Sequence, residues 1–167
     1  MDRFVFETKL TAADGGEIEG KAWDFTRPDR VGDVILPAAF KGVPMPLPML
    51  FGHDQNDPVG AWTEAHVAAD GLYLKGRLLV EDLPRAREVR ALVQSGAVRG
   101  LSIGFITKKA AGRKGGGREI AELELLETSI VAIPMHPGAR VTSAKTAVEA
   151  LNIAAALNRA SAHFNVR

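Results

Sequence analysis

The sequence predicts a β-rich α+β fold, and two alternating stretches and one helical stretch carry that prediction. Residues 98–106 and 121–133 alternate apolar with small or polar side chains over most of their length, which is the period of a β-strand. Residues 83–95 follow a helical period instead. Pro84 suits the first turn of that helix, and Gly96 suits the position after its end. Strands therefore account for more of the chain than helices do.

The remaining expected elements are shorter and are bounded by turn residues. In chain order they are strands at 4–8 and 16–25, a helical turn at 37–40, a short strand at 47–53, and a hairpin of 59–67 with 71–80. Residues 110–118 are basic and rich in glycine. Because strands flank them on both sides, we expect a mobile hairpin loop rather than a phosphate-binding loop. Residues 143–164 carry alanines at helical spacing, with Ser143 as the expected N-cap.

Composition narrows the classes of function. A chain of 167 residues is long enough for one domain with a core of its own. Its 21 lysines and arginines nearly balance its 20 aspartates and glutamates, so nothing indicates a nucleic acid as the main partner. Cysteine is absent, which excludes disulfides, thiolate catalysis and a zinc–thiolate site. We expect no signal peptide, and no apolar run approaches the ~20 residues of a membrane span.

Ser102 stands between two glycines in the segment Gly100-Leu101-Ser102-Ile103-Gly104. In a strand, alternation places Leu101 and Ile103 on one face, and Ser102 with both glycines on the other. The serine face is then almost bare, and glycine within a strand often marks the close approach of a ligand or another backbone. That clearance suits a nucleophile that attacks a peptide carbonyl. A bulge or a tight sheet crossing would explain the same glycines with Ser102 as a bystander.

Glu127 occupies an unexpected position in the expected strand at 121–133. Uninterrupted alternation puts it on the same face as Leu123, Leu125 and Val131, where the pattern asks for an apolar residue. A buried carboxylate needs a cationic or hydrogen-bonding partner, because burying it alone is costly. An imidazolium formed during proton transfer would be such a partner. A structural salt bridge to an arginine, or a strand face that is partly wet, would also explain it.

His53 ends the short strand at 47–53, and turn-forming residues follow it. A histidine at a strand end is well placed to act as a general base, although a lone histidine is more often structural. Asp54 and Asp57 are near in sequence, but the spacing of the three residues matches no strong metal-ligand motif. We therefore expect no metal and no cofactor. Weaker candidates for the base are His66 and His136, and His163 lies near the C-terminus.

Four sequence blocks occur together in a fixed order. They are residues 20–25 with 32–34 and 39–40, residues 49–54 with 58–60, residues 100–104, and residues 126–131 with Pro134 and 137–139. Each block alone is weak, but their order and spacing cover most of residues 3–142. Together they resemble the tailed-phage prohead maturation proteases, which are distantly related to herpesvirus assemblin. The chain departs from the family pattern at His136, where an asparagine more often precedes the proline.

The resemblance implies a fold and an activity. The fold would be a closed or partly closed β-barrel flanked by helices, as in the herpesvirus proteases. The chain would be a serine endopeptidase in which Ser102 is the nucleophile and His53 is the general base. Glu127 would be the acidic third member, where assemblin-type enzymes use a second histidine. His136 is the alternative third member.

The resemblance also implies partners and a location. The substrates would be the major capsid protein and its scaffold segment, and the enzyme would be a homodimer without a nucleic-acid or membrane partner. It would act in the host cytoplasm, inside the immature capsid of a phage or gene-transfer particle. We expect a protease domain at 1–143. At 144–167 we expect a C-terminal helix or tail that packs on this domain or on a second subunit.

Two other classes of function compete with a protease. A non-catalytic capsid-assembly or scaffolding module could have the same fold, but it would be expected to lose Ser102 or His53, and both are present. An esterase or amidase acting on small molecules would need a deep apolar pocket beside the serine. The bare glycine face suits an extended peptide better.

Overall fold

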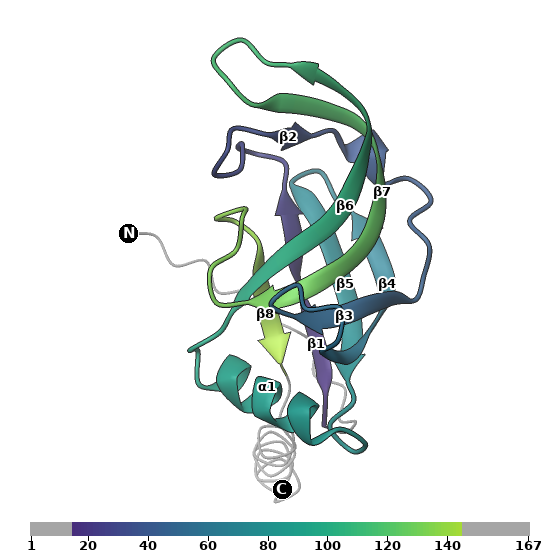
Figure 1. The fold of residues 1–167 in the computed structure, drawn as a ribbon, viewed down its shortest axis with the longest axis vertical. Coiled ribbons are helices and arrows are strands. Elements are labelled where there is room, and N and C mark those ends of the chain that lie inside the picture. The colour runs from purple at the N-terminus through teal and green to yellow at the C-terminus, as the bar shows by residue number, and fades with distance from the viewer. Residues whose placement is uncertain (1–14, 145–167) are drawn as a thin grey trace, which may run out of the picture. The chain divides into compact units, whose positions relative to one another are not determined.

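The computed structural model describes residues 15–144, and within them residues 16–144 form one compact unit (Figure 1). The strands are β1 (Glu17–Asp24), β2 (Val34–Ile35), β3 (Leu47–Phe51), β4 (Pro58–Val67), β5 (Gly71–Leu78), β6 (Gly100–Gly112), β7 (Arg118–Val131) and β8 (Arg140–Ala144). The helices are the 3-10 helix η1 (Pro37–Phe40) and the α-helix α1 (Pro84–Gln94). The expected strand at 4–8 lies outside the described residues.

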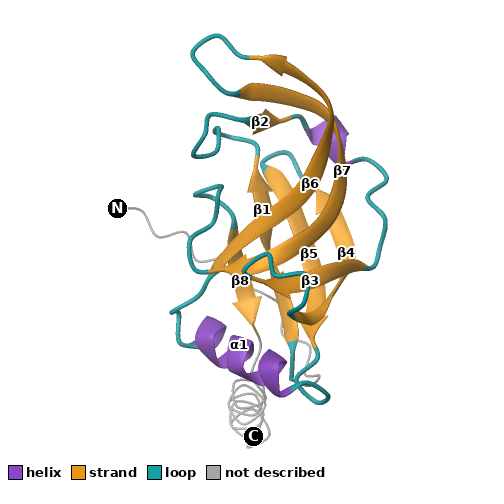
Figure 2. Ribbon diagram, viewed as in Figure 1, coloured by secondary structure: helices purple, strands orange, loops and turns teal. Residues whose placement is uncertain are grey.

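The strands close into a barrel. From β7 the order runs through β3, β4, β5, β1 and β8 to β6, and a second pairing joins β6 back to β7. The short strand β2 pairs in parallel with the start of β7. Closure removes the exposed sheet edges that would otherwise pair with other chains. Figure 2 shows the result: β6 and β7 form a long hairpin that crosses the barrel and extends beyond it. The β-rich fold and the closed barrel are both confirmed.

The closing strand β8 was not expected from the sequence. It pairs with β1, where Glu19 lies opposite Ser143, and it meets β6 where Arg140 lies opposite Gly100. The backbones of Ser143 and of Ala144 after it both belong to the ladder with β1, so no helix begins directly after Ser143, as the expected N-cap would require. The rest of the expected C-terminal helix lies outside the described residues, so the domain boundary at 143/144 stays a prediction.

Large apolar side chains fill the barrel and fix its strands relative to one another. Trp62 is fully buried, and its indole N–H donates to the backbone oxygen of Thr128 at 2.9 Å, which ties β4 to β7. Other fully buried side chains come from strands all round the barrel, including Met49, Leu72, Leu101 and Ile130. This core holds β3, β6 and β7 in the arrangement on which the candidate site depends.

Helix α1 matches its expected range of 83–95 and lies at the end of the barrel opposite the tip of the β6–β7 hairpin (Figure 1). Pro84 occupies the first turn, where its missing N–H costs nothing. Gly96 has a φ of 76°, the left-handed conformation that ends many helices, and its N–H donates to the oxygen of Val93 at 3.0 Å. Ala86, Val89 and Val93 form the buried face.

The expected basic loop at 110–118 is a hairpin, as predicted, but it is shorter and is held at its base. Strand pairing continues to Gly112 opposite Arg118, so that only residues 113–117 form the turn. The guanidinium of Arg113 donates to the backbone oxygen of Gly32. The Arg118 amide donates to Asp33 at 2.8 Å, and its guanidinium makes further hydrogen bonds to the same carboxylate. These contacts tie the hairpin to the segment that precedes β2.

The ion pair at the base of this hairpin predicts a pH dependence of stability. The hydrogen-bonded Arg118 guanidinium lowers the pKa of Asp33 below its ordinary value. A carboxylate with a lowered pKa stabilises the fold above its unfolded pKa of about 3.9, and this stabilisation disappears as the pH falls through the folded value. We expect Asp33→Asn to lower the free energy of unfolding at pH 7. The difference from the native chain should shrink steadily below pH ~4.

Urea unfolding of both proteins between pH 7 and pH 3 measures this difference. Asp82→Asn is the matched control, because Asp82 is an exposed carboxylate that makes no ion pair with any described residue. A difference between the Asp33→Asn variant and the native chain that stayed constant over the whole range would show that the charge of Asp33 does not stabilise the fold.

Candidate active site

Strands β6 and β7 carry the polar residues of the candidate site on the outer face of the barrel. Ser102 lies opposite Ser129, and Gly104 lies opposite Glu127. Residues that pair across neighbouring strands share a face of the sheet. Leu101 is fully buried in the core, so Ser102 points to the other side of the strand. The alternation expected for 98–106 is confirmed.

A β-bulge places Glu127 on this outer face. The partner of Gly104 is Glu127, but the partner of Phe105 is Leu125, so Leu126 is an extra residue without a partner in β6. The bulge reverses the alternation of β7: Leu125 is buried in the core, whereas Glu127 and Ser129 share the face of Ser102. The expectation that Glu127 shares a face with Leu123 and Leu125 was therefore wrong, because it assumed uninterrupted alternation.

The two glycines that flank Ser102 make room for other parts of the same chain. A Cβ at Gly104 would collide with the carboxylate of Glu127. A Cβ at Gly100 would lie 2.7 Å from Cδ of Pro134. The glycine face is thus covered on both sides of Ser102, by Glu127 on one side and by Pro134 on the other.

His53 reaches the site through two consecutive residues in the left-handed conformation. Strand β3 ends at Phe51, two residues earlier than expected, because Gly52 has a φ of 66° and His53 a φ of 62°. The Gly52 amide donates to the backbone oxygen of Ile130 at 3.0 Å, which continues the contact with β7. The His53 amide then donates to the hydroxyl of Ser129 at 3.1 Å. A positive φ is uncommon outside glycine and is kept only where the surroundings impose it. Here the two hydrogen bonds to β7 hold the turn in this conformation.

The His53 and Glu127 side chains form a hydrogen-bonded pair. His53 Nδ1 lies 2.7 Å from Oε1 of Glu127, and the side chain of Glu127 is only 12% exposed. The second oxygen, Oε2, accepts a hydrogen bond from the hydroxyl of Ser129 at 2.6 Å. An ionised carboxylate can only accept, so in a neutral imidazole the proton lies on Nδ1, and Nε2 has a free lone pair. The partners of Glu127 are thus a histidine and a serine, not a structural arginine.

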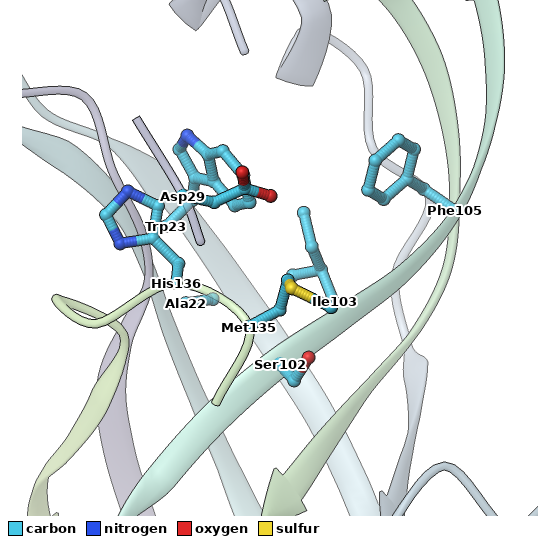
Figure 3. Close-up of a pocket in the computed structure, with 8 residues that line it drawn as sticks. All are labelled: Ala22, Trp23, Asp29, Ser102, Ile103, Phe105, Met135 and His136. Carbon is cyan, nitrogen blue, oxygen red and sulfur yellow. The ribbon is translucent and has the colours of Figure 1, made fainter. Parts of the chain in front are cut away.

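Ser102 is 6% exposed and lines a small cavity of about 30 Å³ (Figure 3). Its side chain makes no hydrogen bond with any described residue, His53 included. Hydrogen bonds between catalytic residues are often long before a substrate binds. The absence of a hydrogen bond between Ser102 and His53 is therefore compatible with catalysis by this pair. Ser102 and His53 are linked through Ser129, which lies opposite Ser102 in the sheet and accepts the His53 amide.

His136 has a structural environment. It is 1% exposed, and its ring meets Trp23 edge-on with 4.6 Å between the ring centroids. Nδ1 accepts the amide of Gly138 at 3.1 Å, and Nε2 lies 3.0 Å from the backbone oxygen of Arg27. Both ring nitrogens are therefore occupied: Nδ1 by the turn at 136–139 and Nε2 by the loop that follows β1. Of the other histidines, His66 is exposed on β4, and His163 lies outside the described residues.

The described residues contain neither a candidate metal site nor a helix that could span a membrane. Within 15–144, His, Asp and Glu side chains form no group of three or more that could hold a metal ion. No helix in this same part of the chain is long and apolar enough to span a membrane.

Sequence reasoning missed two parts of this site, Leu126 and Ser129. The bulge at Leu126 depends on the pairing with β6, which the sequence of β7 does not specify. Ser129 could have been found, since it lies two positions from Glu127 and so shares its face of the strand.

Comparison with known proteins agrees with this fold and this arrangement of residues. The chain belongs to the caudovirus prohead serine protease family, whose model matches residues 5–153. It is 37% identical over 127 residues to a capsid polyprotein of Pseudomonas phage PAJU2, which covers 71% of this chain and 19% of that protein. It is also 37% identical over 110 residues to the prohead protease of Enterobacteria phage HK97, covering 62% of this chain and 48% of that protein.

A solved structure supports the fold independently. The KSHV protease in complex with a hexapeptide phosphonate inhibitor matches with a TM-score of 0.56 at 15% identity, over 80% of this chain and 66% of that one. At this identity the likeness concerns the fold, and it confirms the expected herpesvirus-protease-like barrel. This chain spans less than half the length of both phage relatives.

Proposed function

We propose that this protein is a serine endopeptidase that cleaves capsid proteins during maturation of a phage prohead. The observation that carries the proposal is the 2.7 Å hydrogen bond between His53 and Glu127. Glu127 lies on β7 opposite Gly104, two residues along β6 from Ser102. A serine, a histidine and a carboxylate are the three groups that activate a hydroxyl nucleophile. Membership of the prohead serine protease family supports this assignment.

In the proposed mechanism, each of the three side chains has a distinct role. Glu127 holds the proton of His53 on Nδ1, so that Nε2 can accept the proton of Ser102 as its Oγ attacks the scissile carbonyl. The imidazolium formed in this step is stabilised by the carboxylate. It then gives its proton to the leaving amine, and a water molecule hydrolyses the acyl-enzyme by the same route.

Glu127 is a better third member than His136. The hydrogen bond from Nδ1 of His53 goes to Glu127, whereas both nitrogens of His136 are bonded to Gly138 and Arg27. A histidine with both nitrogens engaged would have to break one of these two hydrogen bonds before it could orient another ring.

The cavity beside Ser102 favours a peptide over a small-molecule substrate. Its volume of about 30 Å³ is far below the roughly 300–1,000 Å³ of pockets that enclose drug-sized ligands. An esterase or amidase of small molecules would need to enclose its substrate. A protease binds an extended chain along its surface and needs space only for individual side chains.

The names of the relatives suggest the substrate and the location. One relative is a capsid polyprotein and another is a prohead protease. We therefore propose that the substrates are the major capsid protein and its scaffold segment. The enzyme would be a homodimer that acts inside the immature capsid in the host cytoplasm.

Labelling with a fluorophosphonate tests the proposed function. This reagent phosphonylates an activated serine, so we expect one adduct per chain, located on Ser102 by peptide mass mapping. Co-expression with the major capsid protein of the same phage should produce a shortened capsid protein. A labelled protein that hydrolyses small esters but leaves the capsid protein intact would favour an esterase. If the protein were neither labelled nor able to cleave the capsid protein, it would be a non-catalytic assembly module.

A further inference from the structure

We infer that Ser129 is a positioning residue that sets the orientation of both His53 and Glu127, an inference that rests on the proposed function. Ser129 is fully buried, and its single hydroxyl contacts both residues. The hydroxyl donates to Oε2 of Glu127 at 2.6 Å and accepts the backbone N–H of His53 at 3.1 Å. It thus links the carboxylate to the backbone of the histidine that this carboxylate orients.

The hydroxyl of Ser129 satisfies two groups that have few alternatives. Glu127 is largely buried, and its other oxygen is already bonded to His53. An alanine at position 129 would leave Oε2 without its hydrogen bond, and the carboxylate could then rotate away from the imidazole. The backbone N–H of His53 would lose its acceptor in a residue whose φ of 62° is already unfavourable.

Ser129 acts through the other residues and not on the substrate. It lies directly opposite Ser102 in the β6–β7 ladder, so it also relates the His53–Glu127 pair to the strand that carries the nucleophile. A change at Ser129 should therefore alter the chemical step more than substrate binding. This separates a positioning role from a substrate-binding one.

The first experiment compares the kinetics of variants on a peptide that spans the capsid cleavage site. We expect Ser129→Ala to lower kcat about tenfold to a hundredfold with little change in KM, as for the loss of a hydrogen bond to a charged group. Thr128→Val is the matched control. It removes a buried hydroxyl from the neighbouring residue, but that hydroxyl has no partner among the described residues and faces the core. Its kcat should equal that of the native chain.

The second experiment measures the tautomer of His53 and does not depend on activity. In full-length Ser102→Ala protein at pH 8, the ¹⁵N NMR shifts of the His53 ring report which nitrogen carries the proton. The hydrogen bond to Glu127 should hold it on Nδ1. Adding Ser129→Ala should move the ring toward the Nε2–H tautomer, whereas adding Thr128→Val should leave the shifts unchanged.

The outcomes separate this inference from the proposed function. A native chain that cleaves nothing would contradict the proposed function, while the tautomer measurement would still test Ser129. A Ser129→Ala variant with native kcat and an unchanged Nδ1–H tautomer would overturn the inference. If Ser129→Ala does not fold, Ser129→Cys decides, because it keeps nearly the same volume with a much weaker donor and acceptor. Native kcat and tautomer in Ser129→Cys would equally overturn the inference.

Discussion

Replacing Ser102 by alanine is expected to abolish cleavage of a co-expressed capsid protein while leaving the protein folded. The substitution removes one oxygen atom that makes no hydrogen bond with any described residue, so little native structure is lost. It also removes the nucleophile on which the whole mechanism depends. In serine proteases such a change lowers kcat by about a million-fold, and we expect an effect of this order here.

Mass spectrometry of the capsid protein after co-expression measures this loss, and circular dichroism checks the fold of the variant. Ser95→Ala is the matched control: Ser95 lies at the end of α1, and its hydroxyl bonds only to local backbone groups. Normal cleavage by the Ser102→Ala protein would exclude Ser102 as the nucleophile.

Glu127→Gln is expected to have the second-largest effect, a fall in kcat of about ten-thousandfold, as for the amide substitution of the acid in other triads. Glutamine has almost the same shape as glutamate but carries no charge to stabilise an imidazolium. Its amide NH₂ can also donate to Nδ1 of His53, which would move the ring proton to Nε2 and block proton transfer from Ser102.

His136→Asn distinguishes the two candidates for the third member. Asparagine cannot reproduce the packing on Trp23 or both hydrogen bonds of the ring, so we expect a lower Tm. The cleavage rate per folded molecule should change far less than in Glu127→Gln. Single-turnover rates measured well below the Tm of each variant make the comparison. An active Glu127→Gln protein beside an inactive, folded His136→Asn protein would assign the role to His136.

Local patterns in the sequence predicted most of the elements of the barrel but not its closure. Alternation predicted β6 and β7, and turn residues predicted the β4–β5 hairpin. In the structure the Ala68 amide closes the turn of that hairpin by donating to the oxygen of Gly71. The 3-10 helix η1 and the helix α1 also lie where they were expected. The short closing strand β8 was missed because its pairing with β1 joins residues more than a hundred positions apart.

The candidate site could be predicted by residue type, but its geometry could not. Ser102, His53 and Glu127 were all identified from the sequence, and the last two are hydrogen-bonded in the structure. For Glu127 the reasoning was right about the need for a partner and wrong about the face. That face depends on a single unpaired residue, Leu126, and pairing register arises from contacts between strands that no local pattern encodes.

The bulge at Leu126 also constrains how the length of this chain can vary during evolution. Deleting one residue there would restore regular alternation and turn either the carboxylate of Glu127 or the apolar side chain of Leu125 to the wrong side of the sheet. Substitutions at this exposed position leave the register unchanged, so they should be tolerated. Insertions and deletions should instead collect in the turn at 113–117, beyond the last strand pair, where extra residues shift no partner.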